Sequence, residues 1–418
     1  MSRNYGRPRP VIRIELFEKF PRSRLILIIV LIIIAVCALG YALVSFLTVD
    51  AGWTTIETDS SKADCSDELI FQYCLGEGEL SATAEHKAVS ALYTETAVKA
   101  YQLFHVSQGF DGVKNLYYIN QHPNEEIVVD EVLYQAFLTI EKYGNRAVYL
   151  APVYAQYSNL FGCNDDAETF SFDPYQNKET AAYFAEIISF AQDKNAIDIK
   201  LLGDNRIELY VSDAYLNYAA ESGLSEFIDF YWMANAFIVD YIADTMKANG
   251  FVRGSISSYD GFVRNLDDVS GSMYAFNLFN RDGKSVHQAG AMQYNTAMSI
   301  IFLRDYPINS SDGQHYYTFR NGEIRTAYID VTDGYCKNAV SNIVSYSHDS
   351  SCADILLQVM PIYIADYFDA EKLSGLAQSE IFSIYCEKNT ILYNEPSLTI
   401  TDLYDKDGTK YVAKCIHQ

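Results

Sequence analysis

The longest unbroken hydrophobic pattern in the chain lies near its N-terminus. Residues 25–47 read LILIIVLIIIAVCALGYALVSFL, which is 23 residues without a charged side chain. About 20 consecutive apolar residues are enough to cross a bilayer as a helix. The run therefore predicts a transmembrane anchor. A cleaved signal peptide is the alternative, and the length of the run disfavours it because the apolar core of such peptides covers only about 7–15 residues.

The charges before this run predict its orientation. Residues 1–24 carry seven Lys or Arg side chains and two acidic ones, and basic flanks remain on the cytoplasmic side of a membrane. We therefore expect a single-pass protein of the cell membrane with its C-terminal part outside the cytoplasm. The predicted segments are a cytoplasmic tail at 1–24, the anchor at 25–47, a juxtamembrane linker at 48–64 and one extracytoplasmic domain at 65–418.

Beyond the linker, apolar side chains recur at helical spacing in five segments. Asp130 precedes the second of them, in the position where a short acidic side chain caps the first N–H groups of a helix. Asn249-Gly250 follows the fourth, and this pair is typical of helix ends. The predicted helices are 82–104, 131–143, 178–193, 228–248 and 352–368, the last beginning near Asp349.

Short apolar or alternating runs between these segments predict strands. A hairpin is predicted around Asp407-Gly408. Strands and helices are interspersed without strict βαβ alternation, so we expect an α+β fold in which helices pack on a largely antiparallel sheet. The predicted strands are 69–75, 207–211, 255–258, 297–303, 324–331, 339–346 and 381–386.

The charge balance excludes one large class of partners. The chain has a net charge of −23, and since residues 1–24 contribute +5, the remainder carries −28. Nucleic acids and anionic lipid surfaces require a basic footprint on the protein. We therefore expect no nucleic-acid partner. The 34 tyrosines fit an ordinary sheet surface as well as a surface that binds carbohydrate, flavin or protein.

Cysteines and histidines show no metal-binding or catalytic spacing. Neither a Walker loop, GxGxxG, HExxH nor GxSxG occurs, and the seven histidines are dispersed. Outside the cytoplasm, the cysteines beyond the apolar run allow one to three disulfides and leave at least one thiol free. These cysteines are Cys65, Cys74, Cys163, Cys336, Cys352, Cys386 and Cys415.

The predicted helix at 228–248 contains a recognisable motif. Residues 229–240 read DFYWMANAFIVD, which is similar to the pattern D-[FL]-G-[GA]-[IL]-A-K-G-[YF]-x-[VA]-D. The retained positions include Asp229, Ala234, Val239 and Asp240.

Two further motifs follow in the same order along the chain. Residues 327–336 read AYIDVTDGYC, similar to HIIDPxTGYP, and keep Asp330 and Tyr335. Within 340–358, the pattern sVtV…ADalsT retains its Ala-Asp pair at Ala353-Asp354 and has Gln358 in place of the Thr. Through these segments the chain resembles the FAD:protein FMN transferase family, the ApbE-like flavin transferases, over about residues 65–370.

The resemblance implies a membrane-anchored enzyme that moves FMN from FAD onto a Thr of an extracytoplasmic acceptor protein with the help of magnesium. Phosphoryl-type transfer of this kind depends on positioning and on neutralising phosphate charge. The resemblance also implies roles for individual residues, namely metal ligation by Ala234, Asp354 and Gln358, flavin binding by Asp229, Asp240 and Tyr335, and a catalytic role for Asp330.

Several motif positions carry other residues here. Tyr259-Asp260 stand where the family has Gly-Gly, Asn235 replaces its Lys, Ala327 its His and Gln358 its Thr. These positions would face the pyrophosphate or hold the metal. Three functions therefore stay open: an active flavin transferase, a catalytically dead flavin- or partner-binding relative of the same fold, and a surface adhesion domain.

Overall fold

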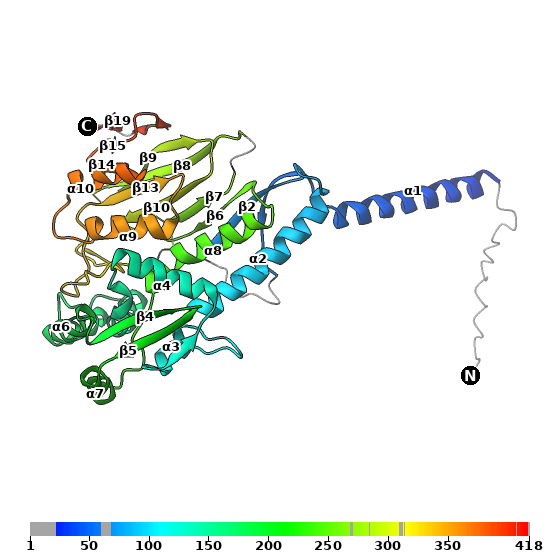
Figure 1. Cartoon of the computed structure of the whole chain (residues 1–418). Coiled ribbons are helices and arrows are strands. Elements are labelled where there is room, and N and C mark those ends of the chain that lie inside the picture. The colour runs from blue at the N-terminus through cyan, green and yellow to red at the C-terminus, as the bar shows by residue number, and fades with distance from the viewer. Residues whose placement is uncertain are drawn as a thin grey trace, which may run out of the picture.

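The computed structural model describes residues 22–59, 68–267, 271–283, 285–308, 312, 314–406 and 408–416. Helix α1 (Arg22–Leu47) covers the apolar run and extends away from the folded domain (Figure 1). Most of the predicted cytoplasmic tail, residues 60–64 of the linker, Cys65 and Asp407 lie outside the described residues.

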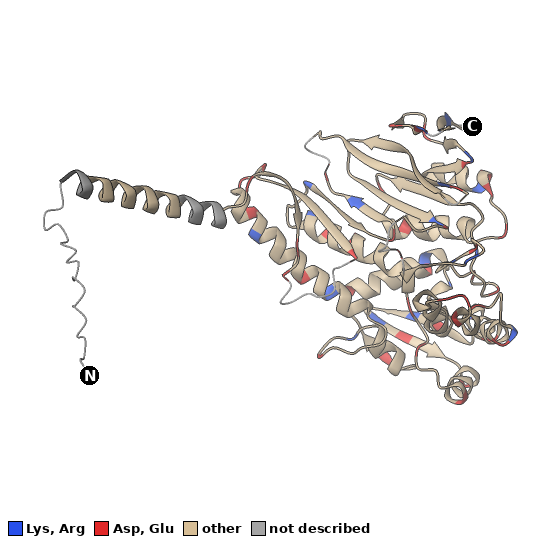
Figure 2. Ribbon diagram, turned by 180° about the vertical axis from the view of Figure 1, so that it is seen from behind, with Lys and Arg blue, Asp and Glu red and all other residues tan. Residues whose placement is uncertain are grey.

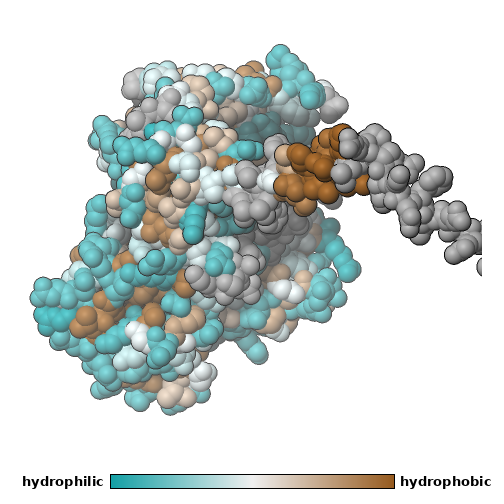
Figure 3. All heavy atoms as spheres, turned by 90° about the vertical axis from the view of Figure 1, so that its right-hand side faces the viewer, coloured by the Kyte–Doolittle hydropathy of each residue, from teal (hydrophilic) through white to brown (hydrophobic). Residues whose placement is uncertain are grey.

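The side chains of α1 are described from residue 26 to residue 40, and all of them are exposed. Figure 2 shows no charged residue along this stretch, and Figure 3 shows it as a hydrophobic segment that projects from the domain. Within the part of the chain that the structure describes, no helix meets the length and hydropathy required of a membrane-spanning segment.

A nine-stranded sheet forms the centre of the domain. All neighbouring strands are antiparallel except the last two, which are parallel. The order is β1 (Gly52–Ile56), β2 (Leu69–Leu75), β6 (Gly254–Ser258), β7 (Phe262–Asn265), β10 (Met298–Arg304), β13 (Asn342–Ser347), β14 (Phe382–Glu387), β15 (Thr390–Tyr393) and β19 (Val412–Cys415).

Both faces of this sheet are covered. Helices α2 (Ala82–Phe104), α8 (Ala234–Ala248) and α9 (Cys352–Tyr363) pack on one face (Figure 1). A small sheet of β8 (Tyr274–Asp282), β9 (Ser285–Tyr294) and β16 (Thr399–Thr401) packs on the other and encloses a second core. Every residue of β10 and β13 is buried as a result, which is why β10 reads as a nearly continuous apolar run.

A second layer lies beyond the helices (Figure 1). Its sheet has the order β3 (Glu126–Val128), β5 (Arg206–Val211), β4 (Ile197–Gly203). Around it lie α3 (Leu116–Gln121), α4 (Glu131–Tyr143), η1 (Ala147–Leu150), α5 (Ala151–Tyr157), η2 (Ser158–Gly162), η3 (Glu168–Ser171), α6 (Lys178–Gln192) and α7 (Asp213–Ser222). The remaining short elements are β11 (Tyr316–Thr318), β12 (Ile324–Thr326), α10 (Ala370–Gly375), η6 (Leu376–Ser379), β17 (Asp405–Lys406) and β18 (Thr409–Lys410).

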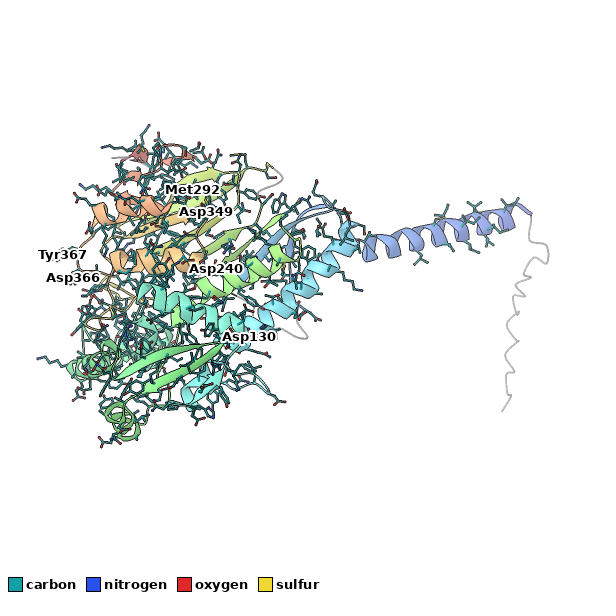
Figure 4. All side chains as sticks on the ribbon, viewed as in Figure 1. Asp130, Asp240, Met292, Asp349, Asp366 and Tyr367 are labelled. Carbon is teal, nitrogen blue, oxygen red and sulfur yellow. The ribbon has the colours of Figure 1, made fainter. Side chains whose placement is uncertain are left out.

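The α+β prediction is confirmed, and helix ends marked by capping residues fall where the sequence predicts them. Asp130 accepts a hydrogen bond from the N–H of Val132 at 3.0 Å and begins α4, which ends at Gly144 in the left-handed region. Asp130 also pairs with Lys99 of α2 at 2.8 Å (Figure 4). Asn249 caps α8, and Gly250 follows with φ +82°.

Three predicted elements are shorter than expected. The predicted helix at 228–248 begins only at Ala234, because Tyr231 adopts φ +46° and forms a separate turn, η4 (Tyr231–Met233). The predicted helix at 352–368 ends at Tyr363, whose carbonyl accepts a hydrogen bond from Ala339 instead of continuing the helix. Of the predicted strand at 324–331 only β12 forms, since Asp330 begins a tight turn.

The sequence also left the state of the cysteines open. Every cysteine that the structure describes is a free thiol, including those at positions 74, 163 and 415, which are partly exposed. The described residues therefore form no disulfide, and the stability of this part of the domain rests on its two hydrophobic cores.

Candidate functional site

A cavity of about 590 Å³ opens beside the start of α8. It is bounded by α2, by the turn that precedes α8 and by the loop that connects β6 to β7. Its lining combines acidic side chains (Glu68, Asp229, Asp260), ring side chains (Tyr101, Phe104, His105, Tyr231, Trp232, His315) and apolar or amide side chains (Leu69, Ala97, Ile238, Asn235). A volume of this size is typical of small-molecule sites.

The kinked turn before α8 shapes the wall of this cavity. The Asp229 carboxylate accepts the N–H of Tyr231 at 2.8 Å and thereby holds Tyr231 in its left-handed conformation. The Tyr231 ring stacks on Tyr154 with centroids 4.6 Å apart. Because α8 begins only after this turn, Ala234 and Asn235 lie at the cavity in the first turn of the helix.

Asn235 joins two carboxylates from distant parts of the chain. Its side-chain amide donates to Glu68 at 3.0 Å and to Asp260 at 2.9 Å. The other oxygen of Asp260 has almost no accessible surface and no hydrogen bond of normal geometry among the described residues, although the Ser258 hydroxyl beside it favours the ionised form and lowers the pKa of Asp260 against the larger effect of burial. The indole N–H of Trp232, a residue only 4% exposed, also lacks a partner there. An unpaired buried polar atom costs about 1–3 kcal/mol, but both atoms lie inside the protein and do not open to the cavity.

The charge in the cavity is negative. No Lys or Arg is among its described lining residues, whereas three carboxylates are. Burial raises the pKa of Asp229 to about 6, although the Tyr231 N–H partly offsets this. Burial also raises the pKa of Asp260 and lowers that of His105. Above pH 6 Asp229 therefore carries its negative charge despite the burial.

The predicted metal ligands fall into two places. Ala234 lines the cavity, whereas Asp354 and Gln358 lie one turn apart on α9 and meet at Tyr143. Asp354 accepts hydrogen bonds from Lys142 Nζ at 2.7 Å, from the Tyr143 hydroxyl at 2.8 Å and from the Ser351 hydroxyl at 2.9 Å. Burial opposes the ionisation of Asp354, but these hydrogen bonds outweigh it and hold its pKa below the usual range.

This arrangement does not fit magnesium. Both oxygens of Asp354 already have donors, and the Gln358 side-chain NH₂ group points to Tyr143 and to a backbone carbonyl. The Lys142 side chain is 61% exposed, so the ion pair itself contributes less than about 1 kcal/mol. Magnesium takes oxygen ligands, often one or two carboxylates together with substrate phosphates, so the obstacle is that the oxygens of Asp354 already accept hydrogen bonds and that Gln358 turns its NH₂ group to this place. Among the described residues no three His, Cys, Asp or Glu side chains are grouped to hold a metal.

Asp240, predicted to bind flavin, has a structural role. Its carboxylate accepts the N–H groups of Cys352 at 2.9 Å and of Ala353 at 2.8 Å, and it pairs with Arg264 at 2.6 Å (Figure 4). Burial raises the pKa of Asp240, against the effect of Arg264 and the two N–H groups. The residue thereby caps α9 and ties it to α8 and β7.

Asp330 and Tyr335 lie in the turn after β12 and do not line the cavity. Asp330 accepts the N–H and hydroxyl of Thr332 and pairs with Lys337 at 2.9 Å. Burial opposes its ionisation, but Lys337 and Thr332 hold its pKa below the usual range. The Tyr335 ring packs edge-on against Tyr175. In this structure both residues therefore stabilise the turn.

Sequence reasoning missed part of the cavity. Glu68, His105 and His315 belong to no motif, and they lie at the cavity only because β2, α2 and the segment before β11 meet there. Lys142 is 212 residues from its partner Asp354. No local pattern in the sequence signals contacts over such separations.

No protein-family model and no curated protein sequence matches the chain. Its fold does match solved structures. The ApbE protein of Thermotoga maritima superposes with a TM-score of 0.53 at 12% identity, over 84% of this chain and 97% of that one. The flavin transferase ApbE of Vibrio cholerae gives 0.52 at 12% identity, over 86% and 99%. The resemblance seen in the motifs is thus confirmed at the level of the fold.

Replacing Asp240 tests its structural role. Asp240→Asn removes the charge that pairs with Arg264 but keeps one acceptor, and breaking a buried pair in this way costs about 3 kcal/mol or more. We expect a clear loss of unfolding free energy in urea, followed by circular dichroism. Asp244→Asn is the matched control, since Asp244 contacts the same Arg264 at 2.9 Å but is 66% exposed. An equal effect of both variants would contradict the assignment.

The raised pKa of Asp229 predicts a pH-dependent stability. Its folded pKa of about 6 exceeds its usual value because of burial, with Glu226 adding to the shift and Tyr231 donating an N–H. Stability is therefore lost as the pH rises from about 4 through 6. Asp229→Asn keeps the acceptor for Tyr231 without the charge, so we expect it to raise the Tm by about 2–4 °C at pH 7.5.

This gain should shrink steadily as the pH is lowered toward 4, because the wild-type carboxyl then becomes neutral in the folded state too. Thermal unfolding at several pH values measures it. Asp111→Asn, at an exposed position, provides the control. A gain for Asp229→Asn that is independent of pH would show that the buried charge is not its cause.

Proposed function

From the ApbE-like fold of this chain, we propose that it is a membrane-tethered binding protein of the extracytoplasmic side, whose cavity holds a ligand but whose flavin-transfer chemistry is lost. The observation that carries this proposal is the state of Asp354. Its carboxylate is shared among Lys142, Tyr143 and Ser351, so both of its oxygens are occupied by hydrogen-bond donors.

The state of Asp354 matters because FMN transfer requires positive charge at the reacting phosphates. A Thr hydroxyl of an acceptor protein would attack the FMN phosphorus of FAD, the bond to the AMP phosphate would break, and AMP would leave. The charge that develops on the phosphate oxygens must be neutralised, for which cations are the usual means. At the cavity this chain offers Glu68, Asp229 and Asp260 instead, and these carboxylates oppose the same charge.

The second candidate is an active FAD:protein FMN transferase acting with magnesium on an extracytoplasmic acceptor protein. The fold supports it, since the neighbour from Vibrio cholerae is a flavin transferase, and so do the retained residues Ala234 and Asp354. A protein that binds FAD or a related molecule in this cavity without transferring FMN is intermediate between the two candidates. The aromatic rings at the cavity favour it, whereas the carboxylates beside them disfavour it.

A transfer assay decides between these candidates. The full-length chain is incubated with FAD, magnesium and an acceptor peptide that carries a Thr, and the peptide mass is followed. We expect no addition of FMN above the level without protein, because neither metal ligands nor a cation faces the pyrophosphate. The proposal fails if FMN accumulates on the peptide, depends on magnesium and is lost in Asp354→Ala.

The membrane tether is part of the same proposal. It is supported by the 23 uncharged residues at 25–47, by the basic segment before them and by the exposure of the apolar side chains of α1. Water-exposed apolar surface on this scale is unfavourable, at roughly 25 cal/mol per Å², so a bilayer is the natural environment for it.

Placing charges in α1 tests the tether. Each Lys at the centre of a transmembrane helix costs about 2.5–3.5 kcal/mol on insertion. We therefore expect the double variant Ile32→Lys, Ile33→Lys to lose carbonate-resistant membrane association, whereas Ile32→Leu, Ile33→Leu keeps it. Membrane fractionation with an antibody to the domain measures both. If the wild-type chain is extracted by carbonate, no tether exists.

A further inference from the structure

The chain enters the folded domain directly after α1. Helix α1 ends at Leu47, and β1 begins at Gly52. Between them, the N–H of Val49 donates to the side-chain oxygen of Thr83 in the first turn of α2 at 2.9 Å. Two residues of chain span at most about 7 Å, so this hydrogen bond holds the first turn of α2 close to the end of α1. No flexible spacer separates the domain from the helix.

The apolar run of the proposed anchor is matched to the thickness of a bilayer. Its 23 residues rise about 1.5 Å each as a helix, roughly 35 Å in total, against a hydrocarbon thickness of about 30 Å. The end of α1 therefore reaches the head groups but cannot carry the domain far above them. Those parts of the domain that surround the end of α1 consequently face the bilayer surface.

Three segments of the domain gather around the end of α1, and we call them the rim. The rim consists of residues 48–53, 76–81 and 271–274. Gly76 lies so close to Ala51 that a Cβ on the glycine would come within 2.7 Å of the Ala51 Cβ. The ring of Trp53 packs edge-on against Tyr274, with centroids 5.8 Å apart. Figure 1 shows α1 meeting the domain at the start of α2, which directly follows the second of these segments.

Each rim segment exposes one large apolar side chain. Trp53 is 50% exposed, Leu80 49% and Met273 63%. Single exposed apolar side chains are ordinary on protein surfaces, but here one stands in each of the three segments that surround the proposed anchor. Tryptophan is enriched at the membrane–water interface, where its ring lies at the level of the head groups. A bilayer surface is therefore the partner that these side chains fit.

The charges of the rim indicate which lipids it suits. It contains the carboxylates of Asp50, Glu77 and Glu79 and no Lys or Arg. Arg253 lies beside Gly78 and offsets part of this negative charge. Attraction to anionic lipids requires a cluster of basic side chains next to the membrane, which the rim lacks. Contact with the bilayer therefore relies on apolar and aromatic side chains and suits zwitterionic head groups.

We propose that the rim docks on the zwitterionic lipid surface around the anchor, with Trp53, Leu80 and Met273 in the head-group region of the bilayer. The inference deepens the tether of the proposed function and rests on it. Docking holds the cavity at a set distance from the bilayer. Glu68 at the cavity and Leu75 beside the rim are seven residues apart along β2, which corresponds to roughly 23 Å.

Tryptophan fluorescence reads this contact directly, since Trp53 and Trp232 are the only two tryptophans of the chain. The full-length chain is held in nanodiscs of phosphatidylcholine that is brominated next to the head group, and in unbrominated nanodiscs for comparison. Bromine quenches a tryptophan only at close range. Trp53→Phe retains Trp232 alone, which is 4% exposed, and supplies the background. We expect Trp53 to lose most of its emission in the brominated nanodiscs and Trp232 to keep its own.

Charged substitutions in the rim test the cause of the quenching. Leu80→Glu combined with Met273→Glu should restore most of the Trp53 emission, because a charged side chain is costly to move out of water. Leu403→Glu combined with Val412→Glu is the matched control and should leave the quenching unchanged. It adds the same charges at positions outside the rim that are 39% and 47% exposed. Thermal unfolding shows that each variant is folded.

Undiminished Trp53 emission in brominated nanodiscs, in a chain that resists carbonate extraction, overturns this inference and leaves the tether standing. Extraction of the chain by carbonate overturns both. Equal recovery of emission in the rim variant and its control overturns the inference as well. Protection of Trp53 from iodide without quenching by the brominated lipid would show that a protein or a second copy of the chain covers the rim, and would also overturn it.

Discussion

The carboxylate of Asp240 is the contact on which the arrangement of the domain depends. It comes from the middle of α8, accepts the first two N–H groups of α9 and pairs with Arg264 of β7. The N-terminus of a helix carries unsatisfied N–H groups and partial positive charge, so a buried carboxylate is stabilised there. One side chain thus fixes two helices on the large sheet.

The starts of α8 and α9, which the motifs assign to one active site, have different surroundings in the structure. The start of α8, delayed by the turn at Tyr231, borders an acidic and aromatic cavity. The start of α9 presents Asp354 to Lys142 and Tyr143 of α4. A metal-dependent phosphoryl transfer would need positive charge at both places. Here the cavity is negative, and the carboxylate that would hold the metal already has a lysine and two hydroxyl groups as partners.

The sequence predicts those parts of the structure that local rules govern. Asp130 and Asn249 mark helix ends because their side chains bond neighbouring backbone groups. The left-handed turn at Tyr231 was not predicted, since a bulky residue seldom adopts positive φ. The hairpin of β8 and β9 was also missed, because much of its outer face is polar and it buries its apolar side chains against another sheet.

The candidate site was predictable only where a motif marked it. Asp229 and Ala234 do lie at the cavity, whereas Asp330 and Tyr335 lie in a turn elsewhere. The contacts that decide its chemistry join residues far apart in the chain. Asn235 meets Glu68 across 167 positions, and Lys142 meets Asp354 across 212. Such pairs follow from the packing of the whole domain, and no window of sequence contains them.

The central claim, that this fold no longer holds the metal on which flavin transfer depends, is tested most directly by electron paramagnetic resonance with Mn²⁺ as a paramagnetic substitute for magnesium. The full-length chain is titrated with Mn²⁺ in the presence and absence of FAD. We expect the signal of free Mn²⁺ to stay undiminished at stoichiometric concentrations. Loss of one equivalent of free signal per chain, abolished by Asp354→Asn, would contradict it.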